Sequence, residues 1–516
     1  MNKRIGINFI AQILAFAINF SISFFLTPFI IENIGVEANG FVTLANTFVE
    51  YAQLFTVALN SMAGRFITIK IHQENYEDAN KYFTSVVFAN LFLSVLFTLV
   101  FAVAIVFLDR FLNISHSSVG DIKLLWAFIA ANFILSLFTS TFSVSTFVTN
   151  RLDKSALINT RGVILRALIL VVCFSFFRPY TFYVGIATIL VGIHNFISYY
   201  FCKVRLTPQL KTKKESFNFG YIKELVASGI WNTVNKLSSI LSSGLDLLVC
   251  NIFVGGVAMG VLNLSKTVSN IVLSLFAMLS SIFAPQLTIA YANNDMAEMK
   301  KQLIFSVKLM GLFASIPIAI LMVFGSTFYQ LWVPSQDAEL LQLLTRLTCF
   351  NLIFALPLEP LYNIFTVRNK IKVSSIALIC FSAASILTVF VGLFFIQDDT
   401  VKIIYIASVG AFYNVVRLLT FLPIYGAKCL DFKRTTFYPV IVRNTLSVIL
   451  LTAVCVGLKL LINVDSWLKL IAVCIGVALI GLVINTLTLF NKEDLQQLVT
   501  TLKQTLRKKE NNHGNS

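Results

Sequence analysis

The stretch IGVEANGFVTLANT at residues 34–47 is followed 220 residues later by VGGVAMGVLNLSKT at residues 254–267, with the same outline of glycines, alanine, leucine and threonine. The same shift, without a gap, aligns residues well beyond the two stretches. The aligned pairs are Gly35 and Gly255, Ala38 and Ala258, Gly40 and Gly260, Leu44 and Leu264, Thr47 and Thr267, Leu59 and Leu279, Ser61 and Ser281, Thr68 and Thr288, and Lys81 and Lys301. Because glycines and lysines align together with apolar residues, we interpret the pattern as an internal repeat.

The amino-acid composition indicates that the chain folds in a membrane. The chain has 516 residues, of which 57% are hydrophobic and 12% charged. Apolar runs of about 20 residues, long enough to cross a hydrocarbon layer of about 30 Å as a helix, recur throughout. We therefore predict an all-α polytopic membrane protein with about fourteen transmembrane helices. The predicted spans are residues 7–31, 40–63, 83–108, 124–147, 162–178, 180–202, 226–250, 257–285, 303–324, 340–365, 374–396, 403–426, 438–461 and 467–490.

The position of the repeat predicts how the spans are organised. Six spans separate the two copies, an even number, so both copies enter the membrane in the same direction and form two parallel six-helix lobes. The predicted parts are a first lobe at 1–202, a basic cytoplasmic linker at 203–224, a second lobe at 225–426, two added helices at 427–490, and a basic amphipathic cytoplasmic tail at 491–516.

The basic residues predict the orientation. The formal charge of +16 comes from lysines and arginines in alternate loops, and they form no single patch of the kind that binds nucleic acid. Cytoplasmic loops of membrane proteins are enriched in these residues. The intervening loops are short and neutral or acidic, for example around Glu32 and Glu37. We expect a multi-pass protein of the bacterial cytoplasmic membrane with both termini in the cytoplasm.

Polar side chains recur on one face of several spans. In span two, Glu50 shares a helical face with Asn46 and Gln53, and spans seven and eight carry comparable stripes. Polar groups avoid lipid, so these faces predict a shared hydrated cavity for substrate. The residues predicted to line it are Lys236, Lys266, Glu50, Asp246, Asn46, Gln53, Asn232, Asn263 and Asn270. The alternatives are hydrogen bonds between helices for the neutral residues and internal ion pairs for the charged ones.

Other intramembrane polar residues have separate interpretations. Arg346, Glu359 and Arg417 are further candidates for the cavity or for ion coupling, whereas Arg166 is interpreted as reaching toward the inner surface and His194 as a bonded core residue. Four prolines offer bends within spans, at Pro28, Pro317, Pro357 and Pro423. The eight cysteines stand singly, and no GxxxxGK[ST] motif occurs. No catalytic residue, metal site or cofactor is therefore predicted.

The chain resembles a known superfamily. Residues 8–48, NFIAQILAFAINFSISFFLTPFIIENIGVEANGFVTLANTF, and residues 58–69, ALNSMAGRFITI, are similar to polysaccharide-unit flippases of the Wzx type. These belong to the multidrug, oligosaccharidyl-lipid and polysaccharide exporter (MOP) superfamily, and the resemblance covers about residues 5–426. It implies a MATE-like fold and movement of polyprenyl-pyrophosphate-linked oligosaccharide units to the outer leaflet for O-antigen, capsule or exopolysaccharide synthesis. It also implies H⁺ or Na⁺ coupling, contact with membrane lipids, and polysaccharide polymerase and glycosyltransferase partners.

Three other functions remain open. A lipid II flippase would also have fourteen spans, but the resemblance implies a more arginine-rich cavity. A cation-coupled multidrug exporter would use Glu50, Asp246 or Glu359 as exchangeable carboxylates, although two lysines in the predicted cavity disfavour cationic drugs. A membrane glycosyltransferase or polymerase would carry its acidic residues on a sizeable outer loop, and the predicted outer loops are short. We therefore expect a transporter and no enzyme.

Overall fold

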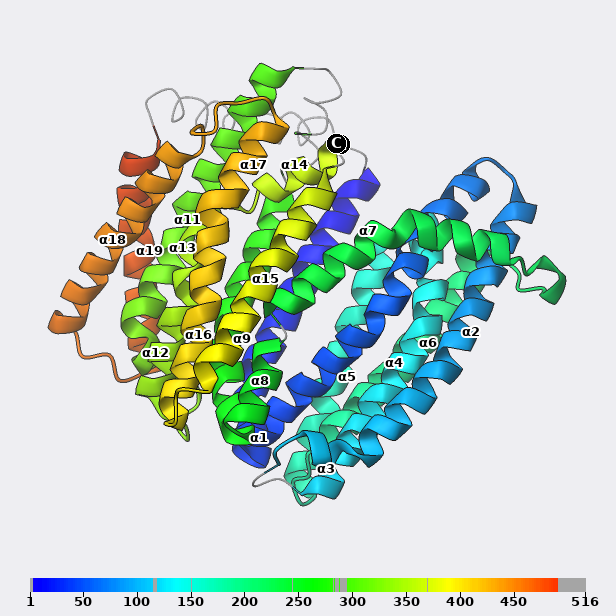
Figure 1. Cartoon of the computed structure of the whole chain (residues 1–516), viewed down its shortest axis with the longest axis horizontal. Helices are drawn as coiled ribbons and strands as arrows, with labels where there is room; N and C mark the ends of the chain where they lie inside the picture. Colours follow the sequence, from blue (N-terminus) through cyan, green and yellow to red (C-terminus); the bar gives the residue numbers. More distant parts are fainter. Residues whose placement is uncertain are drawn as a thin grey trace, which may run out of the picture. The chain divides into compact units, whose positions relative to one another are not determined.

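The computed structural model of the chain describes residues 3–490, except 115–117, 150, 244, 282, 284–286, 288–294 and 369. Within these ranges every regular element is a helix (Figure 1). Eleven helical segments are long and apolar enough to cross a membrane, and the bent pair α12 and α13 gives a twelfth. The prediction of an all-helical, multi-pass membrane protein is therefore confirmed. The predicted tail at 491–516 lies outside the described residues.

The helices divide into two compact units. The first unit comprises residues 1–264 and 378–406, and the second comprises residues 265–377 and 407–516, so that α9, α15 and α16 contribute to both. The first unit contains α1 (Lys3–His72), α2 (Tyr76–Val106), α3 (Leu108–Phe111), α4 (Val119–Val148), α5 (Leu152–Phe176), α6 (Phe182–Leu206), the 3₁₀ turn η1 (Lys214–Ser216), α7 (Phe219–Ser243), α8 (Leu245–Phe253) and the start of α9 (Gly256–Ser281). The second contains α11 (Met296–Trp332), α12 (Ala338–Phe350), α13 (Leu352–Leu358), α14 (Leu361–Val367), the π-helical turn η2 (Arg417–Phe421), α17 (Leu422–Cys429), α18 (Tyr438–Leu461) and α19 (Trp467–Leu489). Helices α15 (Ile371–Leu393) and α16 (Asp399–Val416) complete the described elements.

The described residues give fewer candidate spans than the fourteen predicted, because one long helix covers two predicted spans and one predicted span does not qualify. Helix α1 joins the predicted spans 7–31 and 40–63, and its apolar part Leu14–Ile71 counts once. Predicted span 226–250 falls on α7 and α8, which are not among the eleven candidates. The polar residues Asn232, Asn235 and Lys236 lower the mean hydropathy of α7.

A single glycine lets α1 serve as two spans. The apolar segment of 58 residues would be about 87 Å long at 1.5 Å per residue, far more than the hydrocarbon thickness of about 30 Å. Gly35 interrupts it with φ 85° and ψ 164°, a conformation that only glycine adopts readily. Helix α1 turns back on itself, as Figure 1 shows. Gly255, its counterpart in the repeat, also has a positive φ, 137°.

The repeat brings equivalent glycines into contact inside the first unit. A Cβ atom on Gly40 would lie 2.9 Å from the Cα atom of Gly260, and one on Gly260 would lie 2.4 Å from the carbonyl oxygen of Val36. These contacts need residues without a side chain, which explains why both copies carry glycine. Glu37, expected in an outward-facing loop, is instead only 4% exposed and packs against Gly256 at the start of α9.

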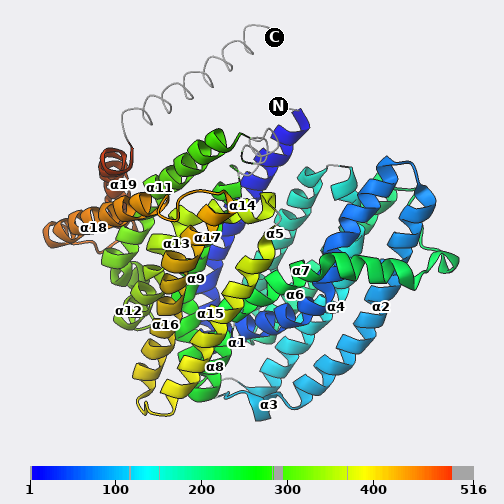
Figure 2. The same ribbon diagram turned by 45° about the horizontal axis from the view of Figure 1, so that its top comes forward.

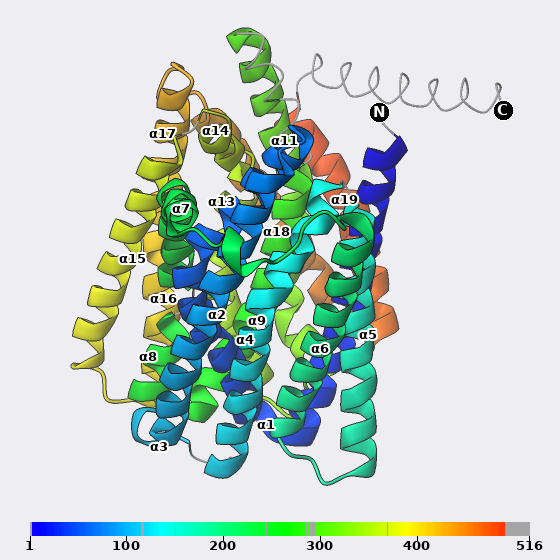
Figure 3. The ribbon, with the colours of Figure 1, turned by 90° about the vertical axis from the view of Figure 1, so that its right-hand side faces the viewer.

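Helices α4, α5 and α6 pack together within the first unit. Helix α6 packs against α4 and α5, and α1 also contacts α4 and α5 (Figure 3). Near the start of α2, apolar side chains of α1, α2 and α4 form a core around Ile67, Phe83 and Val144. The packing of α1 against this bundle determines the direction in which the polar side chains of α1 point.

The segment after α6 is bound to α4 through Ser145 and to α2 through Asn80 and Ser85. The Thr207 hydroxyl donates to the Ser145 hydroxyl at 2.9 Å, the Lys211 amide donates to the Asn80 side chain at 2.6 Å, and the Asn218 amide donates to Ser85 at 3.1 Å. The Tyr82 hydroxyl then donates to Glu224 on α7 at 2.7 Å. The predicted linker 203–224 is thereby anchored within the first unit and sets where α7 begins.

In the second unit, α11 packs against α18 and α19, as Figure 2 shows. The Asn485 side chain of α19 donates to the Leu312 carbonyl at 2.7 Å, and the Asn444 side chain of α18 donates to the Ile353 carbonyl at 2.9 Å. Both asparagines are almost fully buried. Amides in an apolar surrounding need such partners, so these bonds hold the last two helices to the unit.

Candidate functional site

The candidate site in the first unit is an ion pair between α1 and α7. The Lys236 ammonium on α7 lies 3.0 Å from Glu50 Oε2 on α1, and these side chains are 28% and 50% exposed. Both residues were expected in the cavity, with an internal ion pair as the alternative. The pair forms, and half of Glu50 remains accessible.

Close packing of α7 on α1 makes this pairing possible. At Gly229 a Cβ atom would lie 2.1 Å from the carbonyl oxygen of Ala58, so the two backbones nearly touch. One turn after Gly229, the Asn232 side chain donates to the Ser61 hydroxyl at 3.0 Å. Lys236 is one further turn along α7, which places its ammonium beside Glu50.

Three other predicted cavity residues also lie in the first unit. The Asn263 side chain on α9 donates to the Thr43 hydroxyl at 3.0 Å and is only 6% exposed, so it joins α9 to α1. Asn46 is exposed and donates to the Val42 carbonyl of its own helix at 2.8 Å. Gln53 is half-buried on the same helix.

The sequence did not single out Tyr51, which belongs to this cluster. The carboxylates of Glu50 and Asp246 both act electrostatically on the Tyr51 hydroxyl, which relates Asp246 on α8 to the pair. Being next to Glu50 along the chain does not indicate that Tyr51 shares its site, because consecutive residues of a helix point in different directions. The described cluster thus combines one lysine, two carboxylates, a phenol and several amides.

The remaining predicted cavity residues belong to the second unit. Lys266 and Asn270 are one turn apart on α9, where Lys266 is half-buried and Asn270 exposed.

The coupling candidates are also in the second unit, and they separate into two groups. The Arg346 guanidinium donates to the Met322 carbonyl at 2.9 Å, a contact that ties α12 to α11. Arg417 begins the π-helical turn η2 and donates to the Tyr362 hydroxyl at 2.8 Å. Glu359, at the break between α13 and α14, interacts electrostatically with Arg417. The structure therefore associates Glu359 with Arg417, whereas Arg346 binds backbone.

Comparison with known protein families finds no match. A curated relative is the Uncharacterized membrane protein EpsK of Bacillus subtilis (strain 168), which is 27% identical over 503 residues, covering 97% of this chain and 99% of that protein. The relationship is distant and extends over nearly the full length of both chains.

Several solved structures have the same fold. An inward-facing multidrug resistance transporter of the MATE family within the MOP superfamily superposes with a TM-score of 0.68 at 14% identity, over 81% of this chain and 98% of that one. The lipid II flippase MurJ, in an inward closed conformation, gives a TM-score of 0.65 at 15% identity, over 92% of this chain and 97% of that one. A MOP superfamily transporter from Pyrococcus furiosus gives 0.60 at 14% identity, over 82% and 95%. The chain therefore has the fold of MOP superfamily transporters, and the MATE-like prediction is confirmed.

Proposed function

We propose that this protein is a flippase that moves polyprenyl-pyrophosphate-linked oligosaccharide units from the inner to the outer leaflet of the bacterial cytoplasmic membrane. It would serve synthesis of a cell-surface polysaccharide and act by alternating access through a hydrated cavity between the predicted lobes 1–202 and 225–426. The observation that carries the proposal is the partly exposed Lys236–Glu50 pair between α1 and α7. The likeness to EpsK and to a protein named as a lipid flippase supports it.

The pair suits a pyrophosphate because its lysine can change partners. A lysine ammonium binds phosphate as a point charge, and the doubly anionic pyrophosphate attracts it more strongly than one carboxylate does. Substrate would take Lys236 from Glu50 and release the electrostatic bond between α1 and α7. Asn232 and Asn46 offer amide groups to sugar hydroxyls near this position. Binding would thus be coupled to a change in the α1–α7 contact.

A lipid II flippase is the second candidate. It is favoured by the match to MurJ, which extends over 92% of this chain and so over more of it than the match to the MATE transporter. The same lysine would hold the pyrophosphate of either substrate. A cation-coupled drug exporter is less well supported at this site, because Lys236 already neutralises Glu50.

Depletion of the protein in its own host tests the proposal. Polyprenyl-pyrophosphate oligosaccharides would be measured by mass spectrometry after labelling that reaches only one leaflet. Completed units should accumulate on the cytoplasmic side, and their mass would identify the glycan. Accumulation of lipid II alone would select the second candidate. Normal delivery of both substrates to the outer leaflet in the absence of any substituting flippase would contradict both.

A further inference from the structure

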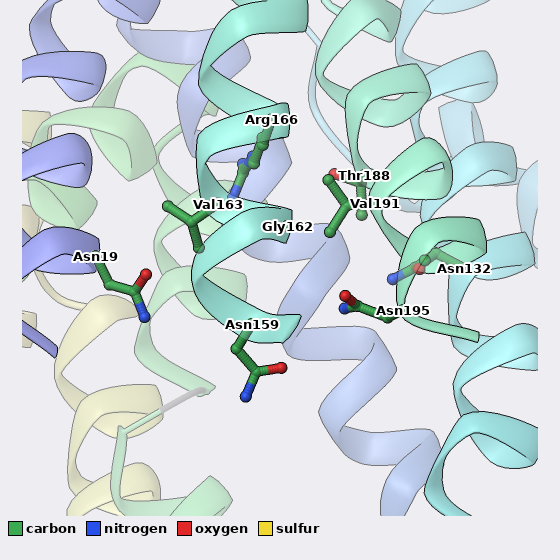
Figure 4. A pocket seen from close by; sticks show the side chains of 10 residues that line it. Asn19, Asn132, Asn159, Gly162, Val163, Arg166, Thr188, Val191 and Asn195 are labelled. Atoms are coloured by element: carbon green, nitrogen blue, oxygen red, sulfur yellow. The ribbon is translucent and has the colours of Figure 1, made fainter. Parts of the chain in front are cut away.

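A second polar site lies among helices α1, α4, α5 and α6 of the first unit, and it shares no residue with the Lys236–Glu50 cluster (Figure 4). Its cavity has a volume of about 370 Å³, at the small end of the range of about 300–1,000 Å³ for ligand pockets. The lining residues are Asn19, Asn132, Asn159, Gly162, Val163, Arg166, Thr188, Val191, Gly192 and Asn195. The volume suits a ligand of about one sugar ring.

Three buried polar atoms in this pocket have no hydrogen-bond partner among the described residues. They are Arg166 Nε, Asn19 Oδ1 and Asn195 Oδ1. Buried polar atoms in proteins are nearly always hydrogen-bonded, and leaving one without a partner destabilises the protein, most of all when the group is charged. The side chain of Arg166, for which the sequence indicated only contact with the inner surface, lines this pocket. Arg166 and Asn195 are therefore available to a ligand.

Two glycines give the amides their positions. A Cβ atom on Gly192 would lie 2.0 Å from Asn132 Oδ1, and one on Gly162 would lie 3.2 Å from Asn195 Oδ1. Any larger residue would displace these side chains. Figure 4 shows Asn132 and Asn195 near each other on their two helices, with Arg166 and Asn159 above and below on α5. The pocket is thus built by the packing of α6 against α4 and α5.

The charge balance of the lining selects an anion. Arg166 carries a permanent positive charge, and none of the lining residues is acidic. The neutral groups are four asparagine amides and the Thr188 hydroxyl, which can donate to and accept from sugar hydroxyls. We propose that this pocket binds an anionic sugar, whose carboxylate or phosphate lies against Arg166 while its hydroxyls meet the asparagines. The ligand is either a free sugar acid or an anionic sugar carried on a lipid.

Binding to the purified protein in lipid nanodiscs tests the proposal. Free glucuronate, with glucose as the neutral control, would be titrated calorimetrically. Glucuronosyl diacylglycerol, with glucosyl diacylglycerol as its control, would be measured by native mass spectrometry. Arg166→Gln removes the charge at nearly constant size, and Arg161→Gln, an exposed arginine on the same helix outside the lining, is the matched control.

The acidic probe should bind the native protein, and Arg166→Gln should weaken it roughly tenfold to a hundredfold, as expected when a hydrogen bond to a charged group is lost. Arg161→Gln should bind normally. Asn159→Asp adds a carboxylate to the pocket at an exposed position and should also weaken binding of the acid. This variant tests the proposal even if Arg166→Gln does not fold. Binding of free glucuronate would identify a soluble sugar acid as the ligand. Binding of the glucuronosyl glycolipid alone would identify a lipid-borne sugar acid. No binding of either acid, equal binding of the neutral probes, or indifference to both variants would overturn the proposal.

Discussion

The Lys236 ammonium is expected to pair with Glu50 in the absence of substrate and to bind the substrate pyrophosphate when substrate is present. Lys236→Ala should therefore reduce the movement of an anionic lipid-linked substrate by about tenfold or more, because it removes a charged hydrogen bond to the substrate. Membrane insertion should be unaffected, since a partly exposed ion pair contributes only about 0.2–1 kcal/mol to stability. The measurement is the appearance of labelled oligosaccharide in the outer leaflet at equal protein abundance.

Glu50→Gln separates the two roles of Lys236. This variant frees the lysine without removing it, so transport should fall less than in Lys236→Ala, and the apparent affinity for substrate should rise. Lys469→Ala, which removes a lysine paired with Asp465 in an exposed position, is the control and should transport normally. Equal, unimpaired flux in Lys236→Ala and the control would exclude Lys236 from the substrate site.

Helical phase predicts which residues of a helix face a polar surface, but it does not predict which groups those residues contact on the next helix. Helical phase places Glu50 and Lys236 on polar faces of their own helices, and both were predicted. Which groups meet depends on how two helices pack, and that is decided by Gly229 and Ala58, which carry no polar side chain. The pocket that Arg166 lines likewise could not be predicted from the sequence, because it depends on how Gly162 and Gly192 pack against Asn195 and Asn132.

The contact between α7 and α1 depends on Gly229. In Gly229→Ala the new Cβ atom would lie 2.1 Å from the Ala58 carbonyl oxygen, so the helices must separate. We expect a loss of about 1–3 kcal/mol in the free energy of unfolding, which is the usual cost of overpacking. Transport should also fall, because Lys236 moves away from Glu50. Thermal unfolding in detergent and flux in cells measure the two effects.

Gly457→Ala is the matched control for this helix contact. Gly457 lies within α18, and an added Cβ atom there meets no atom within 4 Å. The variant should be as stable as the native protein or more stable by up to about 1 kcal/mol, because alanine favours a helix over glycine. If Gly229→Ala and Gly457→Ala unfolded at the same temperature, the close approach of α7 to α1 would be refuted.

Helix breaks were harder to predict than helices. The sequence suggested bends at four prolines, yet α1 passes through Pro28 and α11 passes through Pro317 as helix. Pro357 lies one residue before the end of α13, and Pro423 is at the start of α17. Surrounding helices can satisfy the backbone group that proline frees, so proline alone does not fix a break in a membrane helix. The break within α1 is at Gly35, where the backbone angle itself requires glycine.

For the whole molecule, the number of crossings decides the side on which each terminus lies. Eleven crossings would put the termini on opposite sides of the membrane. The total becomes even when α1 is counted as two crossings and when α12 with α13, and α7 with α8, are each added as one crossing. We predict that both termini are cytoplasmic. A tag fused at either end should react with a membrane-impermeant reagent only after the cells are permeabilised. Labelling of one end in intact cells would contradict this topology.

The repeat was the most informative feature of the sequence at this scale. It predicted that Gly35 and Gly255, and Gly40 and Gly260, would be equivalent, and the structure gives the first pair positive φ angles and brings the second into contact. The division into compact units was beyond the sequence, because α9, α15 and α16 each extend from one unit into the other.

The contact of Gly40 with Gly260 has a consequence for the history of the chain. A residue can touch its own equivalent only where a two-fold axis passes close by, so this contact locates the pseudo-symmetry axis of the repeat. In a dimer of two identical half-length chains, glycine would have met glycine there, and one mutation would have altered both sides of the contact at once. In the present single chain the two positions are separate residues and can change independently. At the neighbouring pair, Thr43 and Asn263, the copies now differ and form a hydrogen bond.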